Sequence, residues 1–91
     1  MKIHQLKILP EYFAPVCLGL KSFEIRENDR DFQVGDLVEL REYLPNHDRY
    51  TGRVLPREIT YVTAYAQQAN YVVFGLGLLD ESEGFSGDDR V

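Results

Sequence analysis

The sequence predicts a single, mainly β domain (α+β) with one or two short helices, curled into a small barrel. Runs in which apolar and polar residues alternate recur along the chain, as expected of half-buried strands. Helical spacing of apolar residues is confined to one short segment near the N-terminus. A chain of 91 residues has room for one hydrophobic core. Closing a curled sheet removes the free strand edges that otherwise pair with other chains.

The first strand and the helix are predicted near the N-terminus. Residues 4–8 alternate, which places His4 on the apolar face, either as a satisfied half-buried side chain or at the floor of a cleft. Pro10 suits the first position of a helix, and Gly19 is a natural stop. Pro15 lacks a backbone N–H, so the helix either kinks there or begins after Pro10. The residues that recur at helical spacing are Tyr12, Phe13, Val16, Cys17 and Leu20.

The remaining strands follow the helix. Residues 22–27 have period two, and we expect Phe23 and Ile25 to face inward, with Ser22, Glu24 and Arg26 on the other face. Residues 37–43 alternate again, and residues 50–63 are rich in β-formers, consistent with one long strand bent at Pro56. Residues 71–79 are apolar on both faces, which predicts an interior strand whose glycines mark tight curvature or close backbone approach.

Charge divides the chain into a domain and a tail. Residues 1–79 hold nine Lys and Arg against ten Asp and Glu, a balance of −1, whereas residues 80–91 hold one Arg against five acids, a balance of −4. The tail is polar and acidic, so we expect it to be disordered. It serves either as a solubilising end or as a nucleic-acid mimic that folds over a basic groove.

Several function classes are excluded by what the sequence lacks. The single cysteine, Cys17, cannot form an internal disulfide and is expected to pack as a small hydrophobe on the helix. No apolar run resembles a signal peptide or a membrane span, so we expect a cytoplasmic protein without a membrane partner. No dinucleotide, P-loop, CxxC or HExxH motif is present, and we expect neither a metal nor a cofactor.

Two stretches carry a resemblance to a known family. Residues 19–26, GLKSFEIR, match the GxKxxExR signature of ASCH domains, a branch of the PUA-like β-barrel superfamily, and residues 26–36, RENDRDFQVGD, extend the match. The chain resembles, over residues 3–79, a small and mostly bacterial and phage ASCH/PUA-like subfamily. The resemblance implies a PUA-like barrel, a cleft lined by the signature strand, and RNA binding as the activity usually inferred for the superfamily.

The signature residues are compatible with that expectation on chemical grounds. Lys21, Glu24 and Arg26 place two cations and a carboxylate around one patch, where the cations suit phosphate and the carboxylate can accept from base amines. Alternatively, Glu24 and Arg26 form an ion pair that only fixes the sheet. The predicted partner is RNA or single-stranded nucleic acid, including a modified nucleotide. The candidate nucleic-acid-binding residues are Lys21, Glu24, Arg26, Asn28, Arg30, Arg53 and Tyr61.

Two other functions remain open. One ASCH branch resembles amidohydrolases acting on acylated cytidine, in which a threonine stands where this chain has Glu24. That departure removes a threonine nucleophile, but a small hydrolase acting on a modified nucleoside could use Glu24 as general base and Lys21 to stabilise an oxyanion. A protein-interaction domain that uses the acidic tail is the third alternative.

Overall fold

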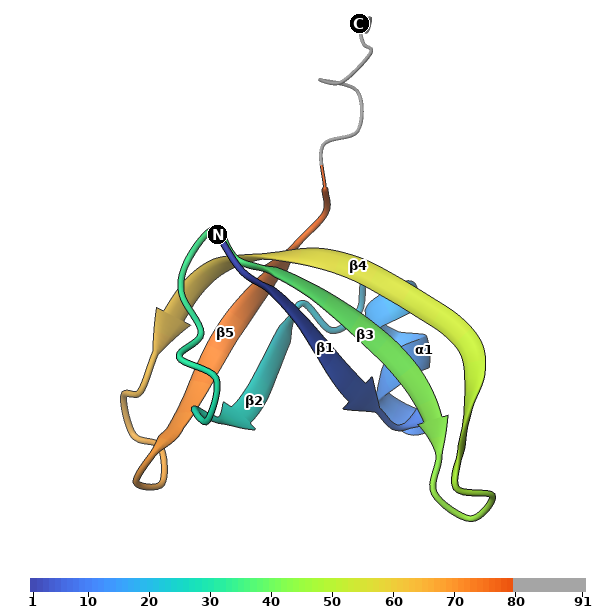
Figure 1. Ribbon diagram of the computed structural model, residues 1–91. Coiled ribbons are helices and arrows are strands. Elements are labelled where there is room, and N and C mark those ends of the chain that lie inside the picture. Colours follow the sequence, from blue (N-terminus) through green and yellow to red (C-terminus); the bar gives the residue numbers. More distant parts are fainter. Residues whose placement is uncertain (80–91) are drawn as a thin grey trace, which may run out of the picture.

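A five-stranded sheet arches over one short helix in the computed structural model, which describes residues 1–79 (Figure 1). The elements in chain order are β1 (Ile3–Ile8), α1 (Pro10–Cys17), β2 (Phe23–Glu27), β3 (Leu37–Leu44), β4 (Arg49–Thr63) and β5 (Tyr71–Gly77). The predicted mainly β class with a short helix is confirmed. The predicted tail, residues 80–91, lies outside the described residues.

The sheet is a half-barrel with two free edges. Its strand order is β1-β3-β4-β5-β2, with β1 parallel to β3 and every other neighbouring pair antiparallel. The expected full closure is therefore not reached, because β1 and β2 stand at opposite ends of the sheet. We call the gap between these two edge strands the seam.

Arginine side chains bridge the seam in place of a backbone ladder. Nη2 of Arg26 donates to the carbonyl oxygen of Lys7 at 2.6 Å, and Nη1 of Arg30 donates to that of Gln5 at 2.9 Å. Both acceptors belong to β1, and both donors come from β2 or the loop after it. These two carbonyls of the β1 edge are thus satisfied without strand pairing.

The concave side of the sheet carries the core. Alternate residues of β1, β3 and β5 point there, and α1 and the β2–β3 loop cover them. Phe74 of β5 is fully buried and lies 4.7 Å, between ring centroids, from Phe32 in that loop. The buried apolar residues are Leu6, Ile8, Phe13, Val16, Phe32, Val38, Leu40, Ile59, Val72, Phe74 and Leu76.

The helix begins at Pro10 and runs through Pro15 to Cys17, so the alternative of a later start is not needed. Only Phe13 and Val16 are buried among its residues. Cys17 is exposed, which corrects its expected place in the apolar face. A helix of eight residues contacts the sheet along a narrow stripe, and the outer positions of its apolar set remain in solvent.

The inward face of β2 is opposite to the one expected. Phe23 and Ile25 are exposed, whereas Glu24 is buried at 5% exposure and lies in register with Phe74. Alternation identifies two faces of a strand but not which of them faces the core. Glu24 can be the buried residue because two cations pair with it.

The interior strand and the long strand are confirmed. β4 is continuous from Arg49 to Thr63, and β5 lies between β4 and β2. A Cβ built on Gly75 or Gly77 falls within 2.6 Å of the Thr60 side chain, so glycine permits the close approach of β4 at an irregularity in its pairing. Across residues 1–79, the structure has no helix long and apolar enough to cross a membrane.

Candidate nucleic-acid interface

The turn between α1 and β2 positions Lys21. The carbonyl oxygen of Pro15 accepts from the N–H groups of both Leu20 and Lys21, at 2.8 and 3.1 Å. Gly19 adopts a φ of +78°, a left-handed conformation that ends the helix and that glycine tolerates best. The chain therefore reverses tightly and brings Lys21 beside the first residues of β2.

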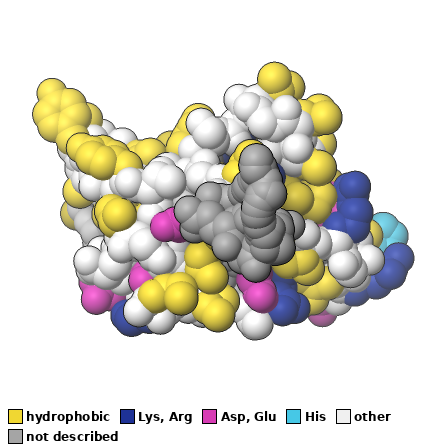
Figure 2. All heavy atoms as spheres, turned by 90° about the horizontal axis from the view of Figure 1, so that it is seen from above, with side chains coloured by type: hydrophobic (Ala, Val, Ile, Leu, Met, Phe, Trp, Pro, Cys, Tyr) yellow, Lys and Arg dark blue, Asp and Glu magenta, His cyan; other side chains and the backbone are white. Residues whose placement is uncertain are grey.

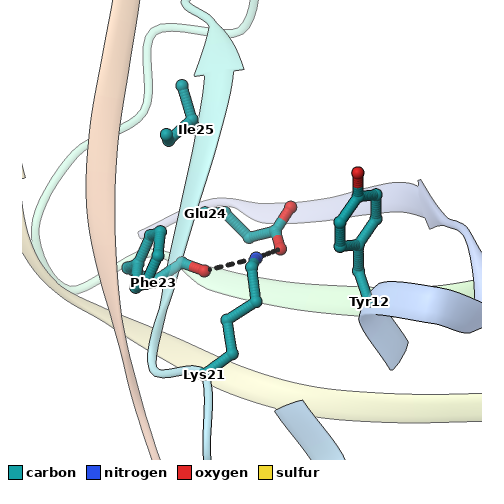
Figure 3. Close-up of a pocket in the computed structure, with 5 residues that line it drawn as sticks. All are labelled: Tyr12, Lys21, Phe23, Glu24 and Ile25. Carbon is teal, nitrogen blue, oxygen red and sulfur yellow. Dashed lines mark hydrogen bonds and ion pairs between the residues drawn. The ribbon is translucent and has the colours of Figure 1, made fainter. Parts of the chain in front are cut away.

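Lys21, Glu24 and Arg26 form one cluster, as the sequence predicted. Figure 3 shows the Lys21–Glu24 pair of this cluster. Nζ of Lys21 lies 2.5 Å from Oε2 of Glu24 and also donates to the carbonyl oxygen of Phe23 at 2.8 Å. Nε of Arg26 donates to Oε1 of Glu24 at 3.1 Å. The buried carboxylate thus carries a cation on each oxygen, and the cluster bears one net positive charge.

The cluster keeps capacity for further hydrogen bonds. An ionised carboxylate offers about four acceptor positions, of which the two cations use two. An ammonium has three donors, and the contacts to Phe23 and Glu24 use two of those of Lys21. A ligand beside Glu24 can therefore donate to the carboxylate while an acceptor on the same ligand meets Lys21.

Two hollows lie against this cluster. We call the first the central hollow: it has a volume of about 280 Å³ and is lined by Tyr12, Lys21, Phe23, Glu24 and Ile25. The second, the seam hollow, measures about 270 Å³ and is lined by Lys7, Ile8, Leu9, Tyr12, Glu24, Ile25 and Arg26. Each is near the small end of ligand sites, about 300 Å³, and the shared residues make them neighbours.

Two aromatic rings flank the ion pair in the central hollow. Tyr12 from α1 stands across from Phe23 of β2, with the Lys21–Glu24 pair between them (Figure 3). Nζ of Lys21 lies 4.9 Å from the centroid of the Phe23 ring and 5.6 Å from that of Tyr12. The rings are 46% and 42% exposed for Tyr12 and Phe23, so an arriving planar group can reach them.

Three other predicted site residues have structural contacts elsewhere. Arg30 bridges the seam, and Oδ1 of Asn28 accepts from the backbone N–H of Phe32 at 3.0 Å, which shapes the loop after β2. Arg53 lies outside both hollows, where its Nε and Nη2 donate to buried Glu42 at 2.8 and 2.9 Å.

Tyr61 also lies apart from the two hollows. It is 65% exposed on β4, in register with Gly75, and Gly75 in turn is in register with Phe23. Tyr61 and Phe23 therefore stand in one row across the sheet, separated by the β5 strand. The row offers exposed aromatic surface but no cation among these three positions.

The buried histidine belongs to a separate pair. Nε2 of His4 donates to Oδ2 of Asp36 at 2.9 Å, and both side chains are 5% exposed. This bond, with the backbone N–H groups of Lys2 and Gln33, lowers the pKa of Asp36 from 3.8 to about 2. The pair ties β1 to the start of β3 and does not line either hollow.

Sequence reasoning missed the aromatic walls. Tyr12 was grouped with the apolar face of the helix, and Phe23 was placed in the core. Phe23 lies two residues after Lys21 and directly before Glu24, whereas Tyr12 lies nine residues before Lys21, so only Phe23 is close to the charged pair in sequence. Lys7, which no sequence pattern singled out, also lines the seam hollow.

Positively charged side chains do not cover the face of the molecule seen in Figure 2. Figure 2, seen from above, shows Lys and Arg side chains toward the edges of the view, with acidic side chains among the hydrophobic ones around the grey atoms. Within residues 1–79, no group of three or more His, Cys, Asp or Glu side chains is placed to hold a metal ion. Among the described residues, the charged cluster of Lys21, Glu24 and Arg26 has two ligand-sized hollows beside it.

Comparison with known proteins places the chain in a family. Residues 3–76 match the family described as "Domain of unknown function (DUF3850)", and the chain belongs to that family. It is also 39% identical, over 62 residues, to the "Uncharacterized 12.9 kDa protein in GpA 3'region" of Escherichia phage P2. That alignment covers 68% of this chain and 55% of the phage protein, so the chain spans about half the length of this relative.

Proposed function

We propose that this DUF3850 domain binds single-stranded nucleic acid, RNA in the first instance, and holds one of its bases in the central hollow. The observation that carries the proposal is the buried Glu24 carboxylate, held between two cations at the wall of a hollow that two aromatic rings flank. The resemblance of residues 19–26 to the ASCH signature supports the same class of ligand.

Each wall of the central hollow suits a different part of a nucleotide. Tyr12 and Phe23 offer faces on which a base can stack, a contact worth about 1–3 kcal/mol per base in single-strand binders. Glu24 suits the exocyclic amine of a base, as carboxylates accept from the N4 amine of cytosine. Lys21 suits a phosphate or carbonyl oxygen. Cytosine and adenine carry that amine and uracil does not, so the proposal includes a preference against uracil.

The test compares two buried glutamates in the full chain. Labelled oligo(C), oligo(A) and oligo(U) are titrated at low salt by fluorescence anisotropy against the wild type, Glu24→Gln and Glu42→Gln. We expect Glu24→Gln to lose at least about tenfold in affinity for oligo(C), because a hydrogen bond to a charged group is removed. Glu42→Gln, the same chemical change at a buried site away from the hollow, should stay near the wild-type affinity.

A second variant keeps the test decisive. Phe23→Ala removes a partly exposed ring, so it should fold while losing the stacking surface, and circular dichroism checks that it does. Equal affinities for all three oligonucleotides in wild type, Glu24→Gln and Phe23→Ala contradict the proposal, as does the absence of binding. Conversion of an acylated cytidine to a new product, detected by mass spectrometry and lost in Glu24→Gln, favours the hydrolase alternative instead.

A further inference from the structure

A third hollow continues the site on the far side of Lys21. We call it the helix-end hollow: it measures about 410 Å³ and is lined by Val16, Cys17, Leu18, Gly19, Lys21, Ser22, Arg57, Leu76 and Leu78. Lys21 lines both this hollow and the central hollow, and the central and seam hollows share Tyr12, Glu24 and Ile25. The three hollows therefore follow one another along α1, from the seam to the end of the helix.

The charges along this path differ from those of the molecule as a whole. The charged side chains in the three linings are four cations, Lys7, Arg26, Lys21 and Arg57, and one carboxylate, Glu24. The full chain has a net charge of −5. A local excess of cations in an acidic protein is the pattern expected where a polyanion is bound.

The cations are also spread from one end of the path to the other. Lys7 lies at the seam end, where its Nζ is 4.3 Å from the centroid of the Tyr43 ring. Arg57 lies at the helix end, where its guanidinium donates to the carbonyl oxygens of Pro56 and Val16 at 2.8 and 3.4 Å. A single nucleotide in the central hollow can contact Lys21. Lys7 and Arg57 lie beyond the two ends of that hollow, so a single nucleotide there does not need them.

We propose that the three hollows form one tract for a single strand of at least three nucleotides, with the middle base in the central hollow and Lys7 and Arg57 as contacts for the flanking phosphates. This inference rests on the proposed function and names its ligand as a strand rather than a free nucleotide. Arg57 thereby becomes a binding residue for the strand that the central hollow alone does not require.

The experiment is a length series with the full chain. Cytidine monophosphate and oligocytidylates of increasing length, as RNA and as DNA, are titrated by calorimetry at low salt. We expect the affinity to rise from the monophosphate to the trimer and then to level off. Arg57→Ala and Lys7→Ala should each weaken trimer binding about fivefold or more and leave the monophosphate unchanged, because each removes one phosphate contact.

Arg49→Ala is the matched control, since Arg49 also lies on β4 but lines none of the three hollows. The salt dependence gives a second readout: for single strands the slope of log K against log salt is about −0.7 per phosphate contact, and Arg57→Ala should reduce it by about that amount. This slope can be measured even if one variant is less stable than the wild type.

The outcomes separate the two proposals. Binding of the monophosphate with no gain in longer strands, or equal effects of Arg57→Ala and Arg49→Ala on the trimer, overturns the tract and leaves the proposed function in place. Absence of binding for every length overturns both. Equal binding of RNA and DNA strands supports recognition through base and phosphate, whereas tighter RNA binding assigns a contact to the 2′-hydroxyl.

Discussion

Two buried glutamates of this protein have similar partners and different surroundings. Glu42 of β3 is 4% exposed and accepts from Thr51 and from two nitrogens of Arg53, at 2.8 to 2.9 Å. Glu24 of β2 is 5% exposed and pairs with Lys21 and Arg26. A buried carboxylate that pairs with cations is therefore not by itself evidence of a binding site.

The difference lies beyond the first contacts. The Arg53 guanidinium covers Glu42 and packs 4.7 Å from the centroid of the Phe13 ring, so its charge pair serves the interior of the fold. Glu24 lines two hollows, and its two cations use only two of the acceptor positions of its carboxylate. What makes Glu24 the candidate site residue is the space next to it.

The largest effect is expected where Glu42 is changed. Glu42→Gln removes the negative charge of a buried carboxylate that accepts three hydrogen bonds. We therefore expect the free energy of unfolding, measured with urea, to fall by about 3 kcal/mol. Its control is Glu39→Gln on the same strand, whose ion pair with Arg41 is half-buried, with side chains 35% and 37% exposed, and should contribute less than about 1 kcal/mol. Equal losses in the two variants contradict the distinction between the buried pair of Glu42 and the half-buried pair of Glu39.

A third buried carboxylate, that of Asp36, extends the comparison to the pH dependence of stability. The folded pKa of Asp36, about 2, is below its ordinary value of 3.8, so its stabilising effect is present above about pH 4 and is lost as the pH falls toward 2. The loss amounts to about 2 kcal/mol. Urea midpoints measured between these pH values should fall less steeply in Asp36→Asn than in the wild type.

Glu42 has a lowered pKa as well, because the hydrogen bonds from Arg53, and secondarily that from Thr51, outweigh the opposite effect of burial. The Asp36→Asn variant should therefore keep part of the acid sensitivity. A wild-type stability that does not change on acidification contradicts the assignment of both carboxylates as stabilising anions.

The smallest expected effect concerns the seam. Arg26→Lys keeps a charge beside Glu24 but loses the fork that also reaches the Lys7 carbonyl, so we expect a loss of about 1 kcal/mol. Amide exchange at the edges of β1 and β2 should quicken, while exchange in β3 and β4 stays unchanged. Unaltered exchange at both edges indicates that the arginine bridges do not hold the half-barrel together.

Much of the fold follows from local patterns. The strands have the expected period, the helix begins at the proline suited to its first turn, and the paired glycines of β5 mark the approach of Thr60. Local sequence patterns do not predict that the sheet stays open at the seam. Whether a sheet closes depends on the relative placement of its first and last strands, and here two long arginine side chains span that distance.

The candidate site was predictable in part, for a related reason. Lys21, Glu24 and Arg26 are near one another in sequence, so their meeting needs only a turn and a strand. Which side of β2 faces inward depends on its β5 neighbours. Phe23 therefore lies at the wall of the central hollow and not in the core, where its strand pattern predicted it. Arg53 pairs with buried Glu42, a partner distant in sequence that local patterns do not reveal, and it lines neither of the hollows beside Glu24.

The central claim, that the hollow beside Glu24 receives a base, is tested most directly by recording amide nitrogen–proton correlation spectra while cytidine monophosphate is added to the full chain. The account predicts that the largest shift changes fall on Tyr12 and residues 21–25, and that the amides of Glu42 and Arg53 hardly move. Largest changes around Glu42, or a spectrum that does not change at a large excess of the nucleotide, contradict it.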